Sequence, residues 1–373
     1  MPRALFLLFA LPIAACEFNG AISQETPSPG PEILAPPASA SAIGATTASA
    51  TPGAANVALK GVRTILGSGI LGSLRHPRGV AAGSAVLAAA DTRNHKIHLS
   101  RSGGTEWAAS GTGLAGYFDG ASTEAQFFYP NGAAVDLDGT VLVVDTDNQA
   151  IRRIGKDGKV TTIAGDTRRG RIDGAALEAR FADPTGIAVD AQGAIFVVEQ
   201  GGSSIRKVAG GQVTTLVGSA GVGFSDGAAD SAMLNRPFGL AADAGGNLYV
   251  ADTDNHRVRK ILPNGFVSTL AGGDPGFKDG IRTAAQFNFP RGVAVDSAGR
   301  VYVADAGNHA IRVIETTGEV KTVAGGTAGF LDGTLAQARF DEPSGLAFYP
   351  DDGSLIIADT NNHRIRAMNP TSP

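Results

Sequence analysis

The sequence predicts an all-β fold, a six-bladed β-propeller, from three observations. A proline, any residue and a glycine recur six times, at an almost constant spacing of 53 or 54 residues. Each period holds four short stretches typical of β-strands, separated by turns. The 51 glycines follow no collagen period, which suits short strands joined by tight turns. The six motifs are Pro77-Gly79, Pro130-Gly132, Pro184-Gly186, Pro237-Gly239, Pro290-Gly292 and Pro343-Gly345.

The first element predicted is a signal peptide over residues 1–15. A weakly basic start precedes a short apolar run from Ala4 to Ala15, which is too short to span a bilayer. The run ends at Cys16, the only cysteine, so no internal disulfide is possible. This ending resembles a bacterial lipoprotein signal, which implies lipidation of Cys16 and anchoring by acyl chains. The alternative is an ordinary signal peptide with a chance cysteine.

Residues 16–56 are rich in Ala, Pro, Ser and Thr and have few bulky apolar side chains. Such a segment cannot bury enough surface to offset the entropy of ordering, so it is predicted to be a tether behind the lipidated cysteine. The propeller is predicted over residues 57–370. The lipoprotein-type signal predicts that the protein is located in the bacterial cell envelope, outside the cytoplasmic membrane.

The fourth repeat illustrates the predicted blade. Its strands are expected at residues 239–243, 248–252, 257–261 and 266–272, with polar or glycine-rich turns between them. Four residues after each repeat proline stands an alanine, as expected on an innermost strand where neighbouring blades converge. The chain ends with a third strand, and its missing fourth strand matches residues 61–67. We therefore expect the N-terminal strand to complete the last blade and close the ring.

The turn between the second and third strands carries the sequence Asp-x-x-Asn-His in four units. It ends at His95, His256, His309 and His363. This pattern resembles the NHL-repeat family, whose motif is Asn-His-Leu. Unit two departs with Asn148-Gln149, and unit three departs fully over residues 199–204. The resemblance implies a six-bladed propeller. It also implies a range of activities, from binding modules to zinc-dependent amidating lyases, with metal-dependent lactonases and streptogramin lyases among related propellers.

Residues that repeat in every unit are interpreted as scaffold. The four turn histidines lie on different blades, too far apart to share a zinc ion, and are expected to pack or hydrogen-bond in their turns. The turn Asp and Asn are expected to bond their own turn's amides. The Asp of five Asp-Gly loops is expected to fix its loop. Five third-strand arginines are expected at the blade edges, paired with acidic side chains. These arginines are Arg152, Arg206, Arg259, Arg312 and Arg366.

Residues that differ between units are the candidate ligand-binding positions. By analogy with other propellers, the Pro-x-Gly turn is placed at the mouth of the central channel. The residues before the prolines are His76, Tyr129, Asp183, Arg236, Phe289 and Glu342. The residues between proline and glycine are Arg78, Asn131, Thr185, Phe238, Arg291 and Ser344. Neutral drift at exposed turns is the competing explanation of their variety.

The function predicted from these patterns is that of a non-enzymatic binding or scaffold module for a protein, glycan or small ligand. No cofactor, metal or catalytic residue is predicted. The alternative is a metal-dependent lyase or lactonase-like hydrolase at the channel mouth, for which His76, Asp183 and Glu342 would be the candidate groups. The net charge of −4 disfavours nucleic acid as a partner.

Overall fold

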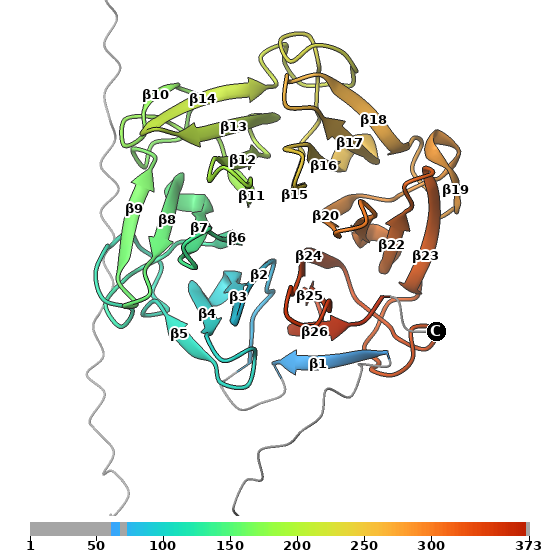
Figure 1. Ribbon diagram of the computed structural model, residues 1–373. Helices are drawn as coiled ribbons and strands as arrows, with labels where there is room; N and C mark the ends of the chain where they lie inside the picture. Colours follow the sequence, from blue (N-terminus) through green and yellow to red (C-terminus); the bar gives the residue numbers. More distant parts are fainter. Residues whose placement is uncertain (1–60, 68–72, 371–373) are drawn as a thin grey trace, which may run out of the picture. The chain divides into compact units, whose positions relative to one another are not determined.

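The computed structural model describes residues 61–67 and 73–370, which all belong to one compact unit, Asn56–Pro373. Its strands form six antiparallel sheets, arranged as blades around a central axis (Figure 1). The predicted six-bladed propeller is confirmed. The predicted signal peptide, Cys16 and the tether lie outside the described residues. Within the described part, none of the helices has the length and apolar character that a membrane span needs.

Each blade has four main strands. In blades 1 to 5 they run in chain order from the axis outward, and two of these blades carry a further short strand at the outer edge (Figure 1). Blade 1 contains β2 (Gly79–Gly83), β3 (Val86–Asp91), β4 (Lys96–Ser100) and β5 (Ala108–Ser110). Blade 2 contains β6 (Pro130–Val135), β7 (Val141–Asp145), β8 (Ala150–Ile154) and β9 (Val160–Ala164). Blade 3 contains β11 (Pro184–Val189), β12 (Ile195–Glu199), β13 (Ser204–Ala209) and β14 (Gln212–Val217), with β10 (Gly174–Ala175) outside β14.

The second half of the ring follows the same plan. Blade 4 contains β15 (Leu240–Ala242), β16 (Leu248–Asp252), β17 (Arg257–Ile261) and β18 (Val267–Gly272). Blade 5 contains β20 (Pro290–Val295), β21 (Val301–Asp305), β22 (Ala310–Ile314) and β23 (Glu319–Gly325), with β19 (Gly280–Ile281) outside β23. Blade 6 contains β24 (Pro343–Phe348), β25 (Leu355–Asp359), β26 (Arg364–Met368) and β1 (Val62–Leu66).

The N-terminal strand β1 pairs with β26, the last strand of the chain, so the two ends of the propeller share one sheet. Val62 lies opposite Met368, and Arg63 lies opposite Ala367. The predicted ring closure is therefore confirmed. The pairing supplies the fourth strand of blade 6 and covers the edge of β26 that would otherwise be unpaired.

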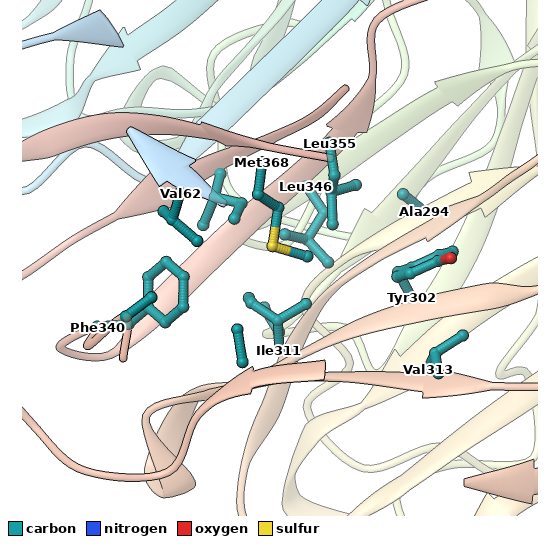
Figure 2. Packing of buried hydrophobic residues seen from close by; sticks show 13 residues of the cluster. Val62, Ala294, Tyr302, Ile311, Val313, Phe340, Leu346, Leu355 and Met368 are labelled. Carbon is teal, nitrogen blue, oxygen red and sulfur yellow. The ribbon is translucent and has the colours of Figure 1, made fainter. Parts of the chain in front are cut away.

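The second strand of every blade is fully buried, because each blade is covered on both faces by its neighbours. These strands are therefore continuous apolar runs, such as Val141 to Val144, with no alternation of polar and apolar residues. Figure 2 shows the core between blades 5 and 6, where Tyr302 and Ile311 of blade 5 belong to the same cluster as Leu346 and Met368 of blade 6.

Short 3-10 helices occupy the turn between the second and third strands in four blades, where the sequence predicted only a turn. A fifth, η4 (Arg282–Ala284), follows β19. The four turn helices are η1 (Thr92–Asn94), η2 (Thr146–Asn148), η3 (Thr253–Asn255) and η5 (Ala306–Asn308).

Candidate functional site

The glycine of each Pro-x-Gly motif lies where two neighbouring blades approach most closely. A Cβ atom on Gly292 would lie 1.9 Å from the carbonyl oxygen of Ser344, the middle residue of the next motif. The equivalent contact recurs between all six pairs of neighbours, at 1.9 to 2.6 Å. Only glycine fits there. These glycines are therefore scaffold residues, as their recurrence in every unit predicted.

The middle residues of the six motifs line a hollow on the propeller axis. Its cavity volume is about 50 Å³, room for only a few water-sized groups. The six glycines complete its rim, and an apolar ring that includes Val80, Leu240 and Leu346 lies below them. The sequence-predicted residues brought together in this wall are Arg78, Asn131, Thr185, Phe238, Arg291 and Ser344.

The residues that precede the prolines do not line this hollow, but they share an unusual backbone. All six have φ between 46° and 50°, a left-handed conformation that costs a non-glycine residue about 1–3 kcal/mol. Glycine would relieve that cost, yet each position carries a side chain, and each side chain is different. The six residues are His76, Tyr129, Asp183, Arg236, Phe289 and Glu342.

A side chain from the preceding blade holds the backbone amide of each of these strained residues. The amide of Tyr129, for example, donates to Nδ1 of His95 at 3.1 Å. The four turn histidines all act this way, and Gln149 and Ser203 supply the same acceptor where the histidine is missing. The histidines are thus structural hydrogen-bonding groups, as predicted. Their bonds cross to the next blade rather than staying within the turn.

Two arginines give one side of the hollow its charge. Arg78 belongs to blade 1 and Arg291 to blade 5, and blade 6, with Ser344, lies between them. Arg291 Nη1 pairs with a carboxylate oxygen of Glu342 at 2.9 Å. Arg78 Nη1 donates only to the amide oxygen of Asn131, at 3.3 Å, and its Nε is buried without a hydrogen-bond partner. Burial lowers the pKa of Arg78, and the positive charges of Arg291 and Arg93 lower it further.

The neutral side of the hollow is held by hydrogen bonds between blades. The Asn131 amide nitrogen donates to the hydroxyl of Thr146 at 2.7 Å, and that hydroxyl donates to the carbonyl of Pro184 at 2.8 Å. Thr185 donates to the carbonyl of Phe238 at 2.8 Å. The wall is therefore rigid and largely satisfied, which leaves Arg78 as its least satisfied polar group.

The remaining charged candidates are engaged away from the hollow. Asp183 accepts hydrogen bonds from Arg169 at 2.9 Å and from Gln149 at 3.2 Å, and these bonds lower its pKa. Arg236 pairs with Asp254 at 3.3 Å. Arg93, Asp147 and Asp254 occupy equivalent positions in the turn between the second and third strands. This position was not predicted from the sequence, although its residues vary between units as the residues beside the prolines do.

The candidate trio of the enzyme alternative is not brought together. Glu342 pairs with Arg291, Asp183 pairs with Arg169, and the ring of His76 packs edge-on against His363 at 4.6 Å between centroids. Among residues 61–67 and 73–370, no group of three or more His, Cys, Asp and Glu side chains is placed to hold a metal ion.

The third-strand arginines are fully buried, so their predicted place at the blade edge is wrong, whereas their predicted pairing with acidic side chains is confirmed. Each joins two acidic side chains, one at the end of the second strand and one in the Asp-Gly loop. Arg152, for example, lies 2.6 Å from both Asp145 and Asp119. The loop aspartates also accept bonds from the fourth strand, as Asp119 does from Thr162, so their predicted role in fixing the loop is confirmed. In blade 1, His98 bonds Asp91 at 3.0 Å in place of an arginine.

The turn Asp and Asn also differ from prediction, because they bond each other and backbone groups outside the turn, not the amides of their own turn. Asp145 Oδ1 accepts the amide of Phe128, and its Oδ2 accepts the side chain of Asn148. Asn148 also donates to the carbonyl of Gly116 in the loop that precedes the blade. The reason is geometric: the inter-blade loop packs against the turn and offers unpaired backbone groups that must be satisfied.

Fold and site together define a six-bladed β-propeller with a small axial hollow. Its wall is lined at equivalent positions by side chains whose type varies from blade to blade. Within this class, the chain contains NHL repeats: the NHL repeat model matches residues 234–261, 287–314 and 340–368. The sequence is similar to the chloroplastic protein SUPPRESSOR OF QUENCHING 1 of Arabidopsis thaliana, with 30% identity over 68% of this chain and 26% of the relative. It is also similar to human NHL repeat-containing protein 2, with 29% identity over 76% of this chain and 44% of the relative. The chain thus spans less than half the length of these relatives.

Solved structures with the same fold carry different functions. An auxiliary nutrient binding protein from Bacteroides thetaiotaomicron matches with a TM-score of 0.62 and 16% identity, over 82% of this chain and 75% of its own. A gluconolactonase from Xanthomonas campestris matches with a TM-score of 0.55 and 17% identity, over 83% of this chain and 90% of its own. A streptogramin B lyase matches with a TM-score of 0.53 and 15% identity, over 82% of this chain and 96% of its own. At these identities the likeness is one of fold alone.

Proposed function

We propose that this propeller is a non-enzymatic binding module of the cell envelope, which holds a protein, glycan or small ligand at the mouth of its axial hollow. The observation that carries the proposal is the ring of six residues before the prolines. Their backbone strain is uniform, and glycine would remove it, yet all six positions carry a side chain, each of a different type. A ring of varied side chains on strained backbone, beside a hollow with a half-buried, poorly satisfied arginine, is suited to ligand recognition.

The solved structures of the same fold include both a binding protein and enzymes, so they are compatible with a ligand-binding role and do not decide between binding and catalysis. One structural neighbour is described as a nutrient binding protein, and others are a gluconolactonase and a lyase. We favour binding over catalysis because the acidic residues at the mouth are paired with arginines rather than directed toward one another. A general base or metal site would need such groups to converge.

A photo-crosslinking experiment tests the binding face. A photoreactive residue is placed at Tyr129, on the mouth face, and in a control at Leu137, in the exposed turn that joins β6 to β7. We expect a defined adduct from Tyr129 and none from Leu137 when the full chain is irradiated in its native envelope. Equal labelling from both positions would contradict a binding face at the mouth.

The lactonase or lyase alternative is tested on the same purified chain. Glucono-δ-lactone is incubated with the protein, with and without Mg²⁺, Ca²⁺ or Zn²⁺. We expect hydrolysis at the buffer rate and no stoichiometric metal. Metal-dependent turnover that is lost in His76→Ala would replace the binding proposal with the enzyme alternative.

Membrane attachment through Cys16 is the second part of the proposal and rests on the sequence alone. The expected result is incorporation of radiolabelled palmitate into the wild-type chain and none into Cys16→Ser, with release of that variant from the membrane fraction. Equal membrane recovery of both chains would contradict lipid anchoring.

A further inference from the structure

We propose that the axial hollow binds the carboxylate head of a small organic anion, with the carboxylate held by the guanidinium groups of Arg78 and Arg291. This inference rests on the proposed binding function and names the chemical class of its ligand. It starts from the charge of the wall: both arginines lie on the arc made by blades 5, 6 and 1, whereas the opposite arc presents the neutral Asn131, Thr185 and Phe238.

Arg78 differs from the fully buried arginines of the propeller in its partners. The five third-strand arginines each bond two carboxylates, as Arg259 does with Asp226 and Asp252. Among the described residues, Arg78 hydrogen-bonds no carboxylate. Its buried Nε has no partner either, but this is also true of Arg259, so the difference lies in the carboxylates. Removing a guanidinium from water costs free energy, and an ion pair with a carboxylate offsets this cost. The missing carboxylate is the feature that points to a ligand.

The local charge favours a monoanion. The charged groups that act on Arg78 are Arg93 and Arg291, which are positive, and Asp147 and Glu342, which are negative. With Arg78 itself, three positive and two negative charges leave a net of one positive charge. A carboxylate neutralises this charge, whereas a phosphate dianion would leave an uncompensated negative charge in the hollow. Paired N–H groups of guanidinium also match the two oxygens of a carboxylate.

The size and lining of the site define the rest of the ligand. A volume of about 50 Å³ admits a carboxylate but not a sugar ring, so the body of the ligand must remain in the mouth. Two aromatic side chains precede the prolines there, Tyr129 with 38% and Phe289 with 45% of its surface exposed. They offer apolar contact surface to a flat or hydrocarbon body. An aryl or short aliphatic carboxylate fits this description.

The test compares benzoate with benzamide, which has the same shape and no charge, and with inorganic phosphate. Binding to the purified full chain is measured by ligand-observed NMR titration at low salt. We expect saturable binding of benzoate at one site, at least about tenfold weaker binding of benzamide, and weakening of the benzoate signal by added salt.

Matched variants separate the site from the general charge of the face. Arg78→Gln and Arg291→Gln are each expected to weaken benzoate at least about tenfold, whereas Arg78→Lys, which keeps the charge, has a smaller effect. Arg169→Gln, which removes a surface arginine paired with Asp183, leaves binding unchanged. Circular dichroism checks that each variant is folded.

Each other outcome overturns the inference. If benzamide binds as tightly as benzoate and competes with it, the hollow is a ligand site but not an anion site, and the proposed binding function stands. If phosphate binds and benzoate does not, the carboxylate assignment is wrong. If benzoate affinity is the same in all variants, the site lies elsewhere. Metal-dependent turnover of a lactone, in contrast, overturns the proposed function itself.

Discussion

The Nδ1 atom of His256 accepts a hydrogen bond of 3.1 Å from the backbone amide of Phe289, the residue that precedes the proline of the next blade. The two rings also pack edge-on, with centroids 4.7 Å apart. A residue of the NHL turn thereby supports the left-handed backbone at the channel mouth. We regard the Asn-His turn as the part of each repeat that joins one blade to the next.

Replacing this histidine tests the role of the hydrogen bond. We expect His256→Ala to lower the free energy of unfolding by about 1–2 kcal/mol, because the Phe289 amide loses its acceptor and the ring contact is lost. His256→Gln is expected to cost less, because Gln149 already supplies this acceptor in blade 2. Urea unfolding compares the three chains. Equal stability of the Ala and Gln variants would contradict the hydrogen-bond role.

The same bonds predict a dependence of stability on pH. Burial lowers the pKa of His95 and of His256 below the usual 6.5. The unfolded chain therefore binds protons more readily at these rings than the folded chain does. Their contribution to stability is complete above pH 6.5 and is lost as the pH falls from 6.5 through the lower pKa values of the folded state. Protonation at Nδ1 would also remove the acceptor.

Unfolding of the wild-type chain and of a His95→Gln, His256→Gln double variant, measured between pH 7.5 and 5.5, checks this prediction. The variant should lose less stability over this range, since glutamine does not titrate. A variant whose stability falls as steeply as that of the wild type would show that the pH dependence arises from other groups.

Two adjacent arginines provide a matched test of the buried clamp. Arg152 is fully buried between two carboxylates, whereas the Arg153 side chain is 38% exposed and pairs with Asp136 alone. Arg152→Met is expected to cost about 3–5 kcal/mol, since it leaves a buried carboxylate unpaired. Arg153→Met should cost less than about 1 kcal/mol. Thermal unfolding of both variants gives the comparison, and similar losses would contradict the clamp.

The close approach at the motif glycines predicts intolerance to a single methyl group. Gly292→Ala would place Cβ 1.9 Å from a backbone carbonyl, so we expect a loss of about 3 kcal/mol in stability. A Cβ atom on Gly273 would lie 3.4 Å from its nearest neighbour, the carbonyl oxygen of Thr283, which is ordinary contact, and Gly273→Ala serves as the control. A Gly292→Ala chain as stable as the control would mean that the blades can separate at the axis.

The fold could be predicted from the sequence because repetition multiplies weak local signals. A single Pro-x-Gly motif predicts no fold, but six of them at nearly constant spacing predict a ring of six similar units. The unmatched strand at residues 61–67 then shows how the ring closes. The burial of Arg152 was beyond prediction, because alternation along a strand does not show which edge is later covered by an inter-blade loop.

The candidate site was predictable in part. The residues beside the prolines differ between repeats, and this predicted that they are candidates for ligand binding. The structure places those between proline and glycine in the wall of the hollow. Sequence could not separate these from the residues before the prolines, because the left-handed backbone at positions such as Phe289 is supported by a hydrogen bond that its amide donates to a side chain of another blade. Nor could it show that Arg78 lacks an acidic partner, which depends on how three blades converge at the axis.

A crystal structure of the protein grown or soaked with benzoate is the most direct test of the proposed binding site. It should show the carboxylate within hydrogen-bond distance of the guanidinium groups of both Arg78 and Arg291, with the ring in the mouth near Tyr129 or Phe289. Benzoate bound on another face, or a hollow without it at saturating concentration, would contradict the proposal.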